Sequence, residues 1–214
     1  MTWNGEALTF DIDERTFPLP SRIRGAVRVY PVAMIEHTVA LDGAGRHRWS
    51  PLAACARVEV ELERPNLRWT GAGYFDSNCG DEPISRAFKR WTWSRAATTN
   101  GTVILYDVTR RTGTPFRLAL DCDDRGAVHP LAPPPPVVLP RTGWGIHRET
   151  QADEGRGAKV LRTLEDTPFY ARSPVETTLY GQTVVAMHES LSLDRIRTGW
   201  VPWLLPFRMP RAWR

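Results

Sequence analysis

The stretch VEVELE at residues 58–63 alternates apolar and acidic side chains without a break. A period of two places Val58, Val60 and Leu62 on one face of a strand and the three glutamates on the other. The same period recurs at residues 8–12, 26–30, 37–41, 67–74, 88–95, 103–109, 116–121, 160–164 and 183–189. Because only residues 190–195 suggest a helix, and a short one, the pattern predicts an all-β protein.

Turn signals separate these runs along the chain. Asp42-Gly43, Asn100-Gly101 and the sequence TGTP at residues 112–115 are typical of tight connections between antiparallel strands. Their spacing predicts antiparallel meanders that close into a barrel or sandwich.

A run of four prolines at residues 133–136 interrupts the strand pattern. Proline favours an extended backbone and donates no hydrogen bond, so we expect residues 131–140 to form a connector that joins no sheet. Residues 1–130 are then the β core that carries the site. Residues 141–214 supply C-terminal strands and an aromatic, basic tail that complete the same fold.

The composition narrows the range of partners and compartments. The net charge is +4, and the basic residues are scattered except for Arg208, Arg211 and Arg214, which excludes a nucleic-acid interface. The sequence has three cysteines, an odd number, and no Cys-x-x-Cys pair. This pattern fits neither a disulfide framework nor a zinc site. No secretion signal or apolar span of about 18 residues is apparent. These features predict a cytoplasmic protein.

The tail WVPWLLPFRMPRAWR at residues 200–214 has two interpretations. Its tryptophans Trp200, Trp203 and Trp213, together with Phe207, alternate with arginines, as suits the headgroup region of a bilayer. It is equally typical of a closing strand packed on a barrel. In either case we expect peripheral contact with the cytoplasmic face of the membrane.

Four residues could form a site for acid chemistry. Strand alternation places His47 and Trp49 on one face, and Tyr74 and Asp76 on one face, so neighbouring strands would gather all four. An apolar surrounding keeps a carboxylic acid neutral; raising its pKa from about 4 to about 7 disfavours the ion by roughly 4 kcal/mol. Trp and Tyr faces stabilise a cation by about 2 kcal/mol when desolvated.

Each of these residues also has a structural interpretation. Asp76 in DSN-x-G is typical of a turn, His47 of a hydrogen-bonded core residue, and Trp49 and Tyr74 of packing. The residues alone leave both possibilities open.

Several other polar residues are predicted to be structural. The thiol of Cys79 is expected to pack, and His188 lacks the Gly-x-Ser-x-Gly elbow of a hydrolase triad. Acids at positions 165 and 166 are expected to bind Arg172 or begin a turn. Those at 121, 123 and 124 lack the spacing of a calcium loop and are expected to form a solvated turn.

Long motifs resemble one protein family. These are LDGAGRHRWSPLA (41–53), ARVEVELERPNLRWTGAGYFDSNCGDEPI (56–84), FKRWTWSRA (88–96), LEDTPFYARS (164–173), HESLSLDR (188–195) and LLPFRMPR (204–211). Together they resemble the C-terminal half of the carotenoid 1,2-hydratase (hydroxyneurosporene synthase) family, which has a lipocalin-like fold. The resemblance runs in order from about Trp3 to Arg211.

The resemblance implies a hydro-lyase that adds water to the terminal C1=C2 double bond of acyclic carotenoids such as neurosporene and lycopene. It implies no organic cofactor and no metal. Asp76 would be the acid that protonates C2, Trp49 and Tyr74 would stabilise the tertiary cation at C1, and His47 would orient Asp76 or accept the proton of the added water.

One departure from the family pattern leaves alternatives open. Family members carry another β-rich half before this one, which would form the other side of the substrate tunnel. We therefore expect a truncated chain or a separately encoded first half as a partner. The alternatives are a non-catalytic carotenoid-binding or lipid-binding module, and a related enzyme that cyclises or isomerises a polyene.

Overall fold

The structure is a computed structural model that describes residues 1–17 and 19–204, and the fold is all-β with antiparallel sheets. One sheet, sheet A, has the order β1-β2-β3-β5-β4, with β6 also paired to β5. Its strands are β1 Thr2–Trp3, β2 Leu8–Arg15, β3 Arg22–Pro31, β4 Val39–Ala40, β5 His47–Arg64 and β6 Leu67–Gly80. The fold class predicted from the period of two is confirmed.

A second sheet, sheet B, has the order β10-β9-β8-β7-β16-β15-β13, with β14 also paired to β15. Its strands are β7 Phe88–Thr98, β8 Gly101–Arg110, β9 Phe116–Asp123, β10 Val128–Leu131, β13 Ala158–Val160, β14 Glu165–Asp166, β15 Tyr170–Leu179 and β16 Gln182–Ser192. The described helical turns are short: α1 Ile84–Ala87, α2 Leu193–Ile196 and the 3-10 turn η1 Val201–Leu204. None of the helices in the described ranges has the length and apolarity needed to cross a bilayer.

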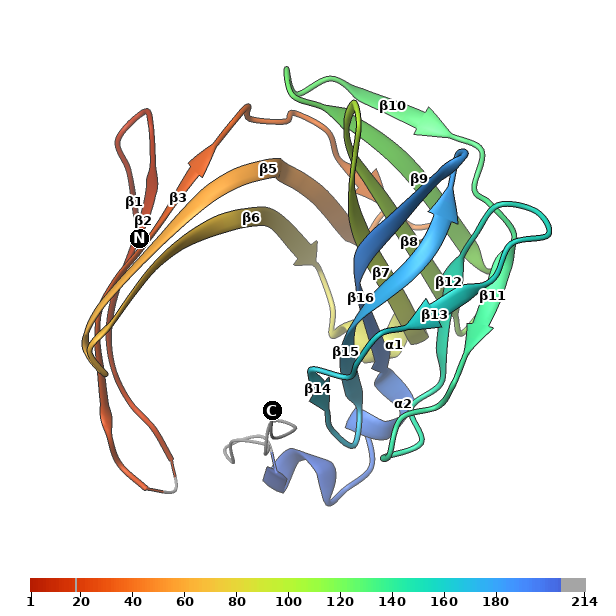
Figure 1. The fold of residues 1–214 in the computed structure, drawn as a ribbon. Helices are drawn as coiled ribbons and strands as arrows, with labels where there is room; N and C mark the ends of the chain where they lie inside the picture. Colours follow the sequence, from red (N-terminus) through yellow and green to blue (C-terminus); the bar gives the residue numbers. More distant parts are fainter. Residues whose placement is uncertain (18, 205–214) are drawn as a thin grey trace.

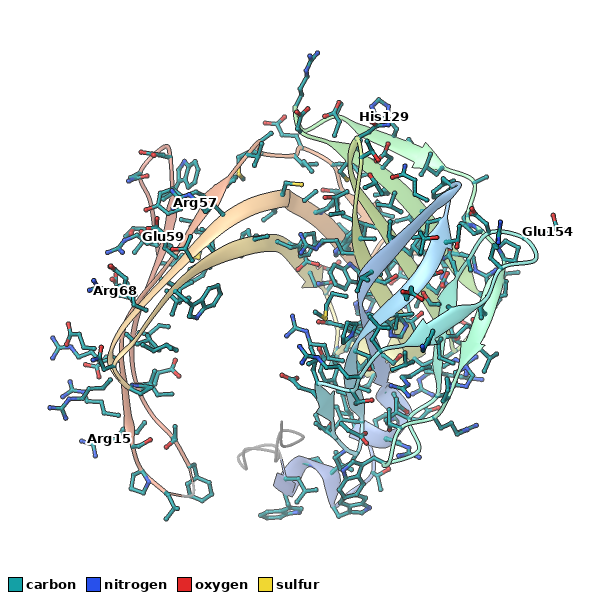
Figure 2. The ribbon with its side chains drawn as sticks, viewed as in Figure 1. Arg15, Arg57, Glu59, Arg68, His129 and Glu154 are labelled. Atoms are coloured by element: carbon teal, nitrogen blue, oxygen red, sulfur yellow. The ribbon has the colours of Figure 1, made fainter. Side chains whose placement is uncertain are left out.

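Sheet A bends into an arc, and only one end of that arc packs on sheet B (Figure 1). The other end projects away from sheet B; we call residues 8–31 and 57–72 the arm. Figure 2 shows Arg57, Glu59 and Arg68 on the outer, convex side of the arm. The alternating apolar residues of β5, such as Val58 and Val60, lie on the opposite, concave side.

The core lies where the two sheets meet. Trp49 from sheet A and Phe88, Ile104 and Leu120 from sheet B are all fully buried in one cluster. The opposite face of sheet B buries smaller side chains, including Ala96, Val103 and Ala186. A separate ribbon of β11 Pro136–Leu139 and β12 Arg148–Gln151 also touches sheet B, because the His188 ring lies 2.9 Å from the carbonyl of Glu149.

The predicted connector at residues 131–140 is therefore wrong at both of its ends. Leu131 closes β10 opposite Ala119, and Pro136–Leu139 form β11 opposite β12. Proline is tolerated at the first residue of a strand, where its missing N–H is not needed, and Pro136 occupies that position. The division into core, connector and closing part stays a prediction.

Other expectations meet the structure with mixed outcomes. The run at 67–74 continues as a strand to Gly80, so the turn interpretation of Asp76 is wrong. The run at 37–41 forms only the two residues of β4, and that at 160–164 contributes only Val160 to β13. In the tail, Trp203 lies in η1 and Trp200 directly precedes it, so neither is in a strand. Phe207, Trp213 and the three terminal arginines lie outside the described residues.

Candidate active site

Strands β5 and β6 are direct neighbours, and their register brings the predicted residues onto one face. His47 lies opposite Gly80 and Trp49 opposite Asn78, while Tyr74 and Asp76 precede Asn78 at intervals of two. Residues directly opposite in a ladder share a face, so all four side chains leave sheet A on the side that faces sheet B. The common face predicted from alternation is confirmed.

Three of the four residues also touch one another. The indole Nε1–H of Trp49 donates to Oδ2 of Asp76 at 2.8 Å, and the phenol of Tyr74 donates to the same oxygen at 3.0 Å. With both donors on Oδ2, the oxygen that remains to carry a proton is Oδ1. The cluster therefore fixes which carboxyl oxygen of Asp76 can act as the acid.

Burial controls the ionisation of this cluster. It raises the pKa of Asp76, and the hydrogen bonds from Trp49 and Tyr74 oppose that rise without cancelling it. The pKa of Tyr74 is also raised, first by burial and then by the neighbouring Asp76, so the phenol stays a donor. A carboxylic acid that keeps its proton to a higher pH than usual, beside two fixed donors, is suited to give that proton to an apolar ligand.

A cavity of about 500 Å³ opens in front of Asp76, between sheets A and B. It is lined by Gly73, Tyr74, Asp76, Asn78, Trp91, Trp93, Arg95, Tyr106, Arg172, Met187 and Glu189. Aromatic rings dominate its wall. Trp49 lies 5.1 Å from Tyr106, and Tyr74 lies 5.0 Å from Trp93, between ring centroids.

Most of this wall comes from sheet B and was missing from the sequence prediction. Glu189, Trp93 and Tyr106 lie directly opposite one another across β16, β7 and β8. The alternation in WTWSR at 91–95 could have indicated that Trp91, Trp93 and Arg95 share a face. Nothing in a single sequence indicated that this face meets Asp76.

Two arginines make one part of the cavity cationic. Arg95 lies over the Tyr74 ring, 5.4 Å from its centroid, and donates to the carbonyl oxygens of Ala54 and Gly73. Arg172 lies 3.4 Å from the carboxylate of Glu189. Burial raises the pKa of Glu189. A positive charge formed in the cavity is therefore disfavoured next to Arg95 and favoured against the ring of Tyr106.

His47 shares the face of the cluster but does not reach Asp76. It lies opposite Gly80, four residues beyond Asp76, which is about 13 Å along the strand. Its buried ring packs on Phe88 at 4.9 Å and lies within 4 Å of carboxylate oxygens of Asp42 and Glu82. Among the described residues the carboxyl of Asp76 is hydrogen-bonded by Trp49 and Tyr74, not by the imidazole.

The structural interpretation of His188 is confirmed, because its ring is fully buried and lies 2.9 Å from the carbonyl oxygen of Glu149. Of the acids expected in a solvated turn, Asp123 accepts backbone hydrogen bonds from Arg125 and Ala127, whereas Asp121 lies within β9. The acids at 165 and 166 form strand β14; Glu165 lies opposite Arg172 in the ladder, but the carboxylate that pairs with Arg172 among the described residues is that of Glu189. Within the described ranges, no group of three or more His, Cys, Asp or Glu side chains could hold a metal ion.

The packing role expected for Cys79 is wrong. Its side chain leaves the opposite face of β6 and is exposed, with Sγ 3.7 Å from Arg48 Nη2. The thiol is therefore outside the cavity.

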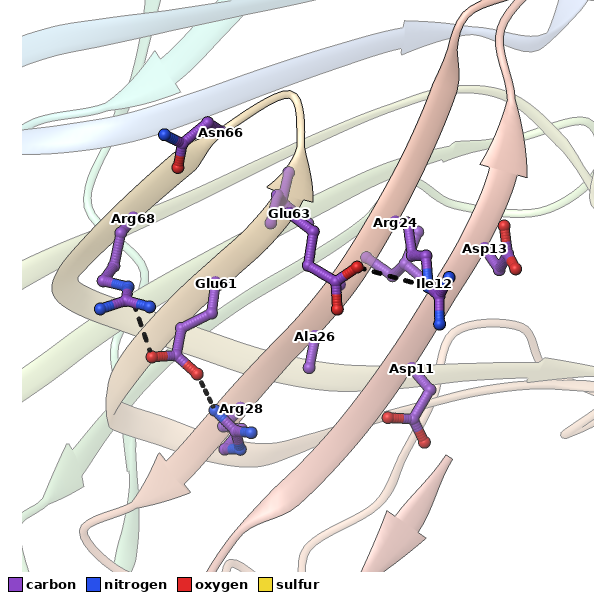
Figure 3. A pocket seen from close by; sticks show the side chains of 12 residues that line it. Asp11, Ile12, Asp13, Arg24, Ala26, Arg28, Glu61, Glu63, Asn66 and Arg68 are labelled. Carbon is purple, nitrogen blue, oxygen red and sulfur yellow. Dashed lines mark hydrogen bonds and ion pairs between the residues drawn. The ribbon is translucent and has the colours of Figure 1, made fainter.

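A larger hollow of about 730 Å³ lies on the arm but has a different character (Figure 3). Its arginines are all paired with carboxylates: Arg24 with Glu63, and both Arg28 and Arg68 with Glu61. Such exposed pairs contribute little energy. The candidate site is therefore the cavity at Asp76.

Comparison with known proteins identifies the family of the chain. The sequence profile of the family described as carotenoid hydratase CrtC matches residues 1–214. The chain belongs to this family. Acyclic carotenoid 1,2-hydratases of Thiocapsa roseopersicina and Rubrivivax gelatinosus are 56% and 46% identical over 99% and 98% of the chain. The Cereibacter sphaeroides hydratase is 37% identical over 99%.

The chain is shorter than these relatives, and its fold is shared with a solved structure. The chain spans 53% of the Thiocapsa protein, 52% of the Rubrivivax protein and 76% of the Cereibacter protein. Among solved structures, an AttH-type protein of Nitrosomonas europaea matches with a TM-score of 0.53, over 79% of this chain and 61% of that one. At 14% identity this match shows the shared lipocalin-like fold alone.

Proposed function

We propose that this chain carries the acid site of a hydratase that adds water to the terminal C1=C2 double bond of an acyclic carotenoid such as neurosporene or lycopene. The observation that carries the proposal is the Asp76 carboxyl group. It is half-buried, its pKa is raised, and two donors occupy one of its oxygens inside an aromatic cavity.

The reaction needs one proton donor and a stabilised cation. Oδ1–H of Asp76 transfers its proton to C2, which leaves the positive charge on the more substituted C1. The rings of Tyr106 and Tyr74 line the cavity and stabilise that cation, while Trp49, fully buried behind this wall, packs on Tyr106 and donates to Asp76. Water adds at C1, and its released proton returns to the carboxylate of Asp76, so the acid is restored.

His47 has a positioning role in this proposal. It precedes Trp49 by two residues on the same face of β5, and its ring is fixed against Phe88. Holding this end of β5 keeps the indole N–H aimed at Asp76. The role is thus indirect, because the imidazole is too far along the strand to exchange a proton with the carboxyl group.

The proposal extends to partners. The substrate is an apolar polyene, so we propose peripheral contact with a membrane that supplies it. Because the chain spans about half of the two most similar relatives described above, we also propose a further β-rich segment as a partner in the complete tunnel.

Expression in cells that accumulate lycopene tests the function. We expect a pigment heavier by one water from the parent chain and none from Asp76→Asn, which keeps size and hydrogen-bond acceptance but cannot supply the proton. Asp107→Asn is the matched control, because Asp107 is also a half-buried acid with a raised pKa but binds Gln151 outside the cavity. This control should keep the activity.

The other outcomes identify the alternatives. Pigment that stays bound but unchanged, even with the first half of a relative co-expressed, would identify a binding module. A product of unchanged mass would identify a cyclase or isomerase. Either result would reject hydration as the function.

A further inference from the structure

A second cavity, of about 440 Å³, lies at the junction of β7, α2 and the loop after β11. It is lined by Lys89, Arg90, Thr109, Arg141, Gly145, Ile146, His147, Leu191, Ser192, Asp194 and Arg195. Four of these side chains are permanently cationic and one is a carboxylate. Pockets of this size commonly hold a small ligand, and this one has the charge for an anion.

The cations of this cavity are not neutralised by the protein. Within residues 1–17 and 19–204, Lys89, Arg90, Arg141 and Arg195 form no ion pair, and the one acid, Asp194, pairs with Arg111 instead. Uncharged groups hold the arginines in place: Arg90 donates to Thr109 at 3.1 Å and Arg141 to the carbonyl of Gly145 at 3.2 Å. The cationic charge is therefore available to a ligand.

The pKa of His147, which lines the cavity, reflects the same positive charges. Burial lowers the pKa of His147, and the nearby charges of Arg90 and Arg141 lower it further, while Glu149 opposes them without cancelling the shift. His147 is thus neutral at pH 7 and leaves the binding of an anion to the guanidinium and ammonium groups.

Exposed tryptophans lie on the side of this cationic cavity that Arg195 lines. Trp144 and Trp200 pair with ring centroids 6.4 Å apart and are 46% and 51% exposed, and Trp203 is 79% exposed. Arg195 joins the two features, because it lines the cavity and donates to the carbonyl oxygen of Trp144. Tryptophan is favoured at the depth of lipid headgroups, where its ring is apolar and its N–H meets water.

We propose that this surface docks on an anionic phospholipid bilayer, with a lipid phosphate in the cationic cavity and Trp144, Trp200 and Trp203 among the headgroups. The proposal rests on the peripheral membrane contact proposed above and assigns it a surface and a lipid class. Charge complementarity selects the occupant: a phosphate alone would use the arginines, whereas only a bilayer also accommodates three exposed indoles.

The docking surface does not overlap the reaction cavity. Arg90 and Trp91 are successive residues of β7, so their side chains leave opposite faces of sheet B. Trp91 lines the cavity at Asp76, and Arg90 lines the cationic cavity. Docking through the cationic cavity thus leaves the reaction cavity uncovered.

Flotation of the full chain with vesicles tests the proposal without any carotenoid. We expect binding to vesicles of phosphatidylcholine with 30% phosphatidylglycerol, and weak binding to pure phosphatidylcholine. Each basic residue near an anionic surface contributes about 1 kcal/mol. The double variant Arg90→Gln/Arg141→Gln should therefore bind about 30-fold more weakly.

A matched control separates location from net charge. Arg15→Gln/Arg68→Gln also removes two positive charges, but from the arm (Figure 2), and should bind like the parent chain. Trp200→Ser should weaken binding while leaving the circular dichroism spectrum unchanged.

Two results would overturn the proposal: equal binding of the two double variants, or binding of inorganic phosphate at the cavity with no vesicle binding. Because no substrate is present, neither result depends on whether the chain hydrates carotenoids.

Discussion

The pKa of Asp76 is subject to two opposing influences that suit this residue to the acid role proposed above. Burial favours the neutral acid, whereas the donors on Oδ2 favour the carboxylate. The acid must be neutral to protonate an alkene, and its conjugate base must be stable enough to form. The two hydrogen bonds therefore lower the cost of giving up the proton, and burial keeps the proton in place until then.

Removing one donor should move the pH dependence of hydration. The rate should fall as pH rises through the pKa of Asp76, since the ionised form cannot donate. In Trp49→Phe that pKa is higher, because a hydrogen bond to a carboxylate worth about 1.5–3 kcal/mol is lost; the falling limb should move upward by about one to two pH units. The rate of water addition, measured across pH with dispersed lycopene, gives the shift.

Trp93→Phe is the matched control for this measurement. Trp93 is also an indole in the cavity wall, but its Nε1 has no hydrogen-bond partner among the described residues. Its removal should lower the rate without moving the limb. A limb that stays fixed in Trp49→Phe would contradict the hydrogen-bonded acid.

At the scale of the strands, the relation between Trp49 and Asp76 does not depend on the irregular part of the β5–β6 ladder. The register shifts between Ser50 and Ala53, and again between Ala53 and Ala56, but each shift adds a residue to β5 and none to β6. Trp49 pairs with Asn78 before either shift, and β6 alternates without a break from Asn78 to Asp76. Strand alternation therefore predicted their common face, although no residue in PLAACA revealed either shift.

Sequence patterns failed where neighbours decide the structure. Strand β15 was missed because Pro174 interrupts YARSPVETTL, yet the strand pairs with β16 along its whole length. Pro174 lies between the residues of β15 that pair with β13 and those that pair with β14. Its missing N–H therefore falls where β15 changes from one partner strand to the other. The sheet B wall of the cavity was missed for a similar reason, because it forms only when two sheets pack.

The Asn100-Gly101 connection between β7 and β8, in contrast, was evident from sequence. Gly101 has φ +152°, and a Cβ there would lie 2.2 Å from the carbonyl oxygen of Cys122. Gly101→Ala should therefore lower the free energy of unfolding by about 2 kcal/mol or more. Gly157→Ala, where a Cβ has nothing within 4 Å, is the control and should change it by less than about 1 kcal/mol. Urea titrations measure both, and equal effects would contradict the steric argument.

Across the whole molecule, adjacent residues of β16 titrate on opposite faces of sheet B. They affect the pH dependence of folding stability in opposite ways. Glu189 lines the reaction cavity, while His188 leaves the opposite face, toward β12. Burial raises the pKa of Asp76, Asp107 and Glu189, so these carboxyl groups stabilise the fold at low pH and that contribution is lost as pH rises through their native pKa values. His188 has the opposite dependence.

Burial lowers the pKa of His188 from 6.5 to about 4, with its Nε2–H donating to the carbonyl of Glu149. The unfolded chain binds a proton below about pH 6.5 that the native protein excludes until about pH 4, so stability is lost as pH falls through that window. The loss is at most about 3 kcal/mol.

His188→Gln keeps an amide donor near Nε2 but cannot titrate. The difference in unfolding free energy between parent and variant, measured by urea titration from pH 7 to pH 4, should shrink by that amount, and the carboxyl groups cancel in the difference. His129→Gln, at an exposed histidine, should show no such change, and a constant difference for His188→Gln would mean that the buried imidazole does not set the acid limit of the fold.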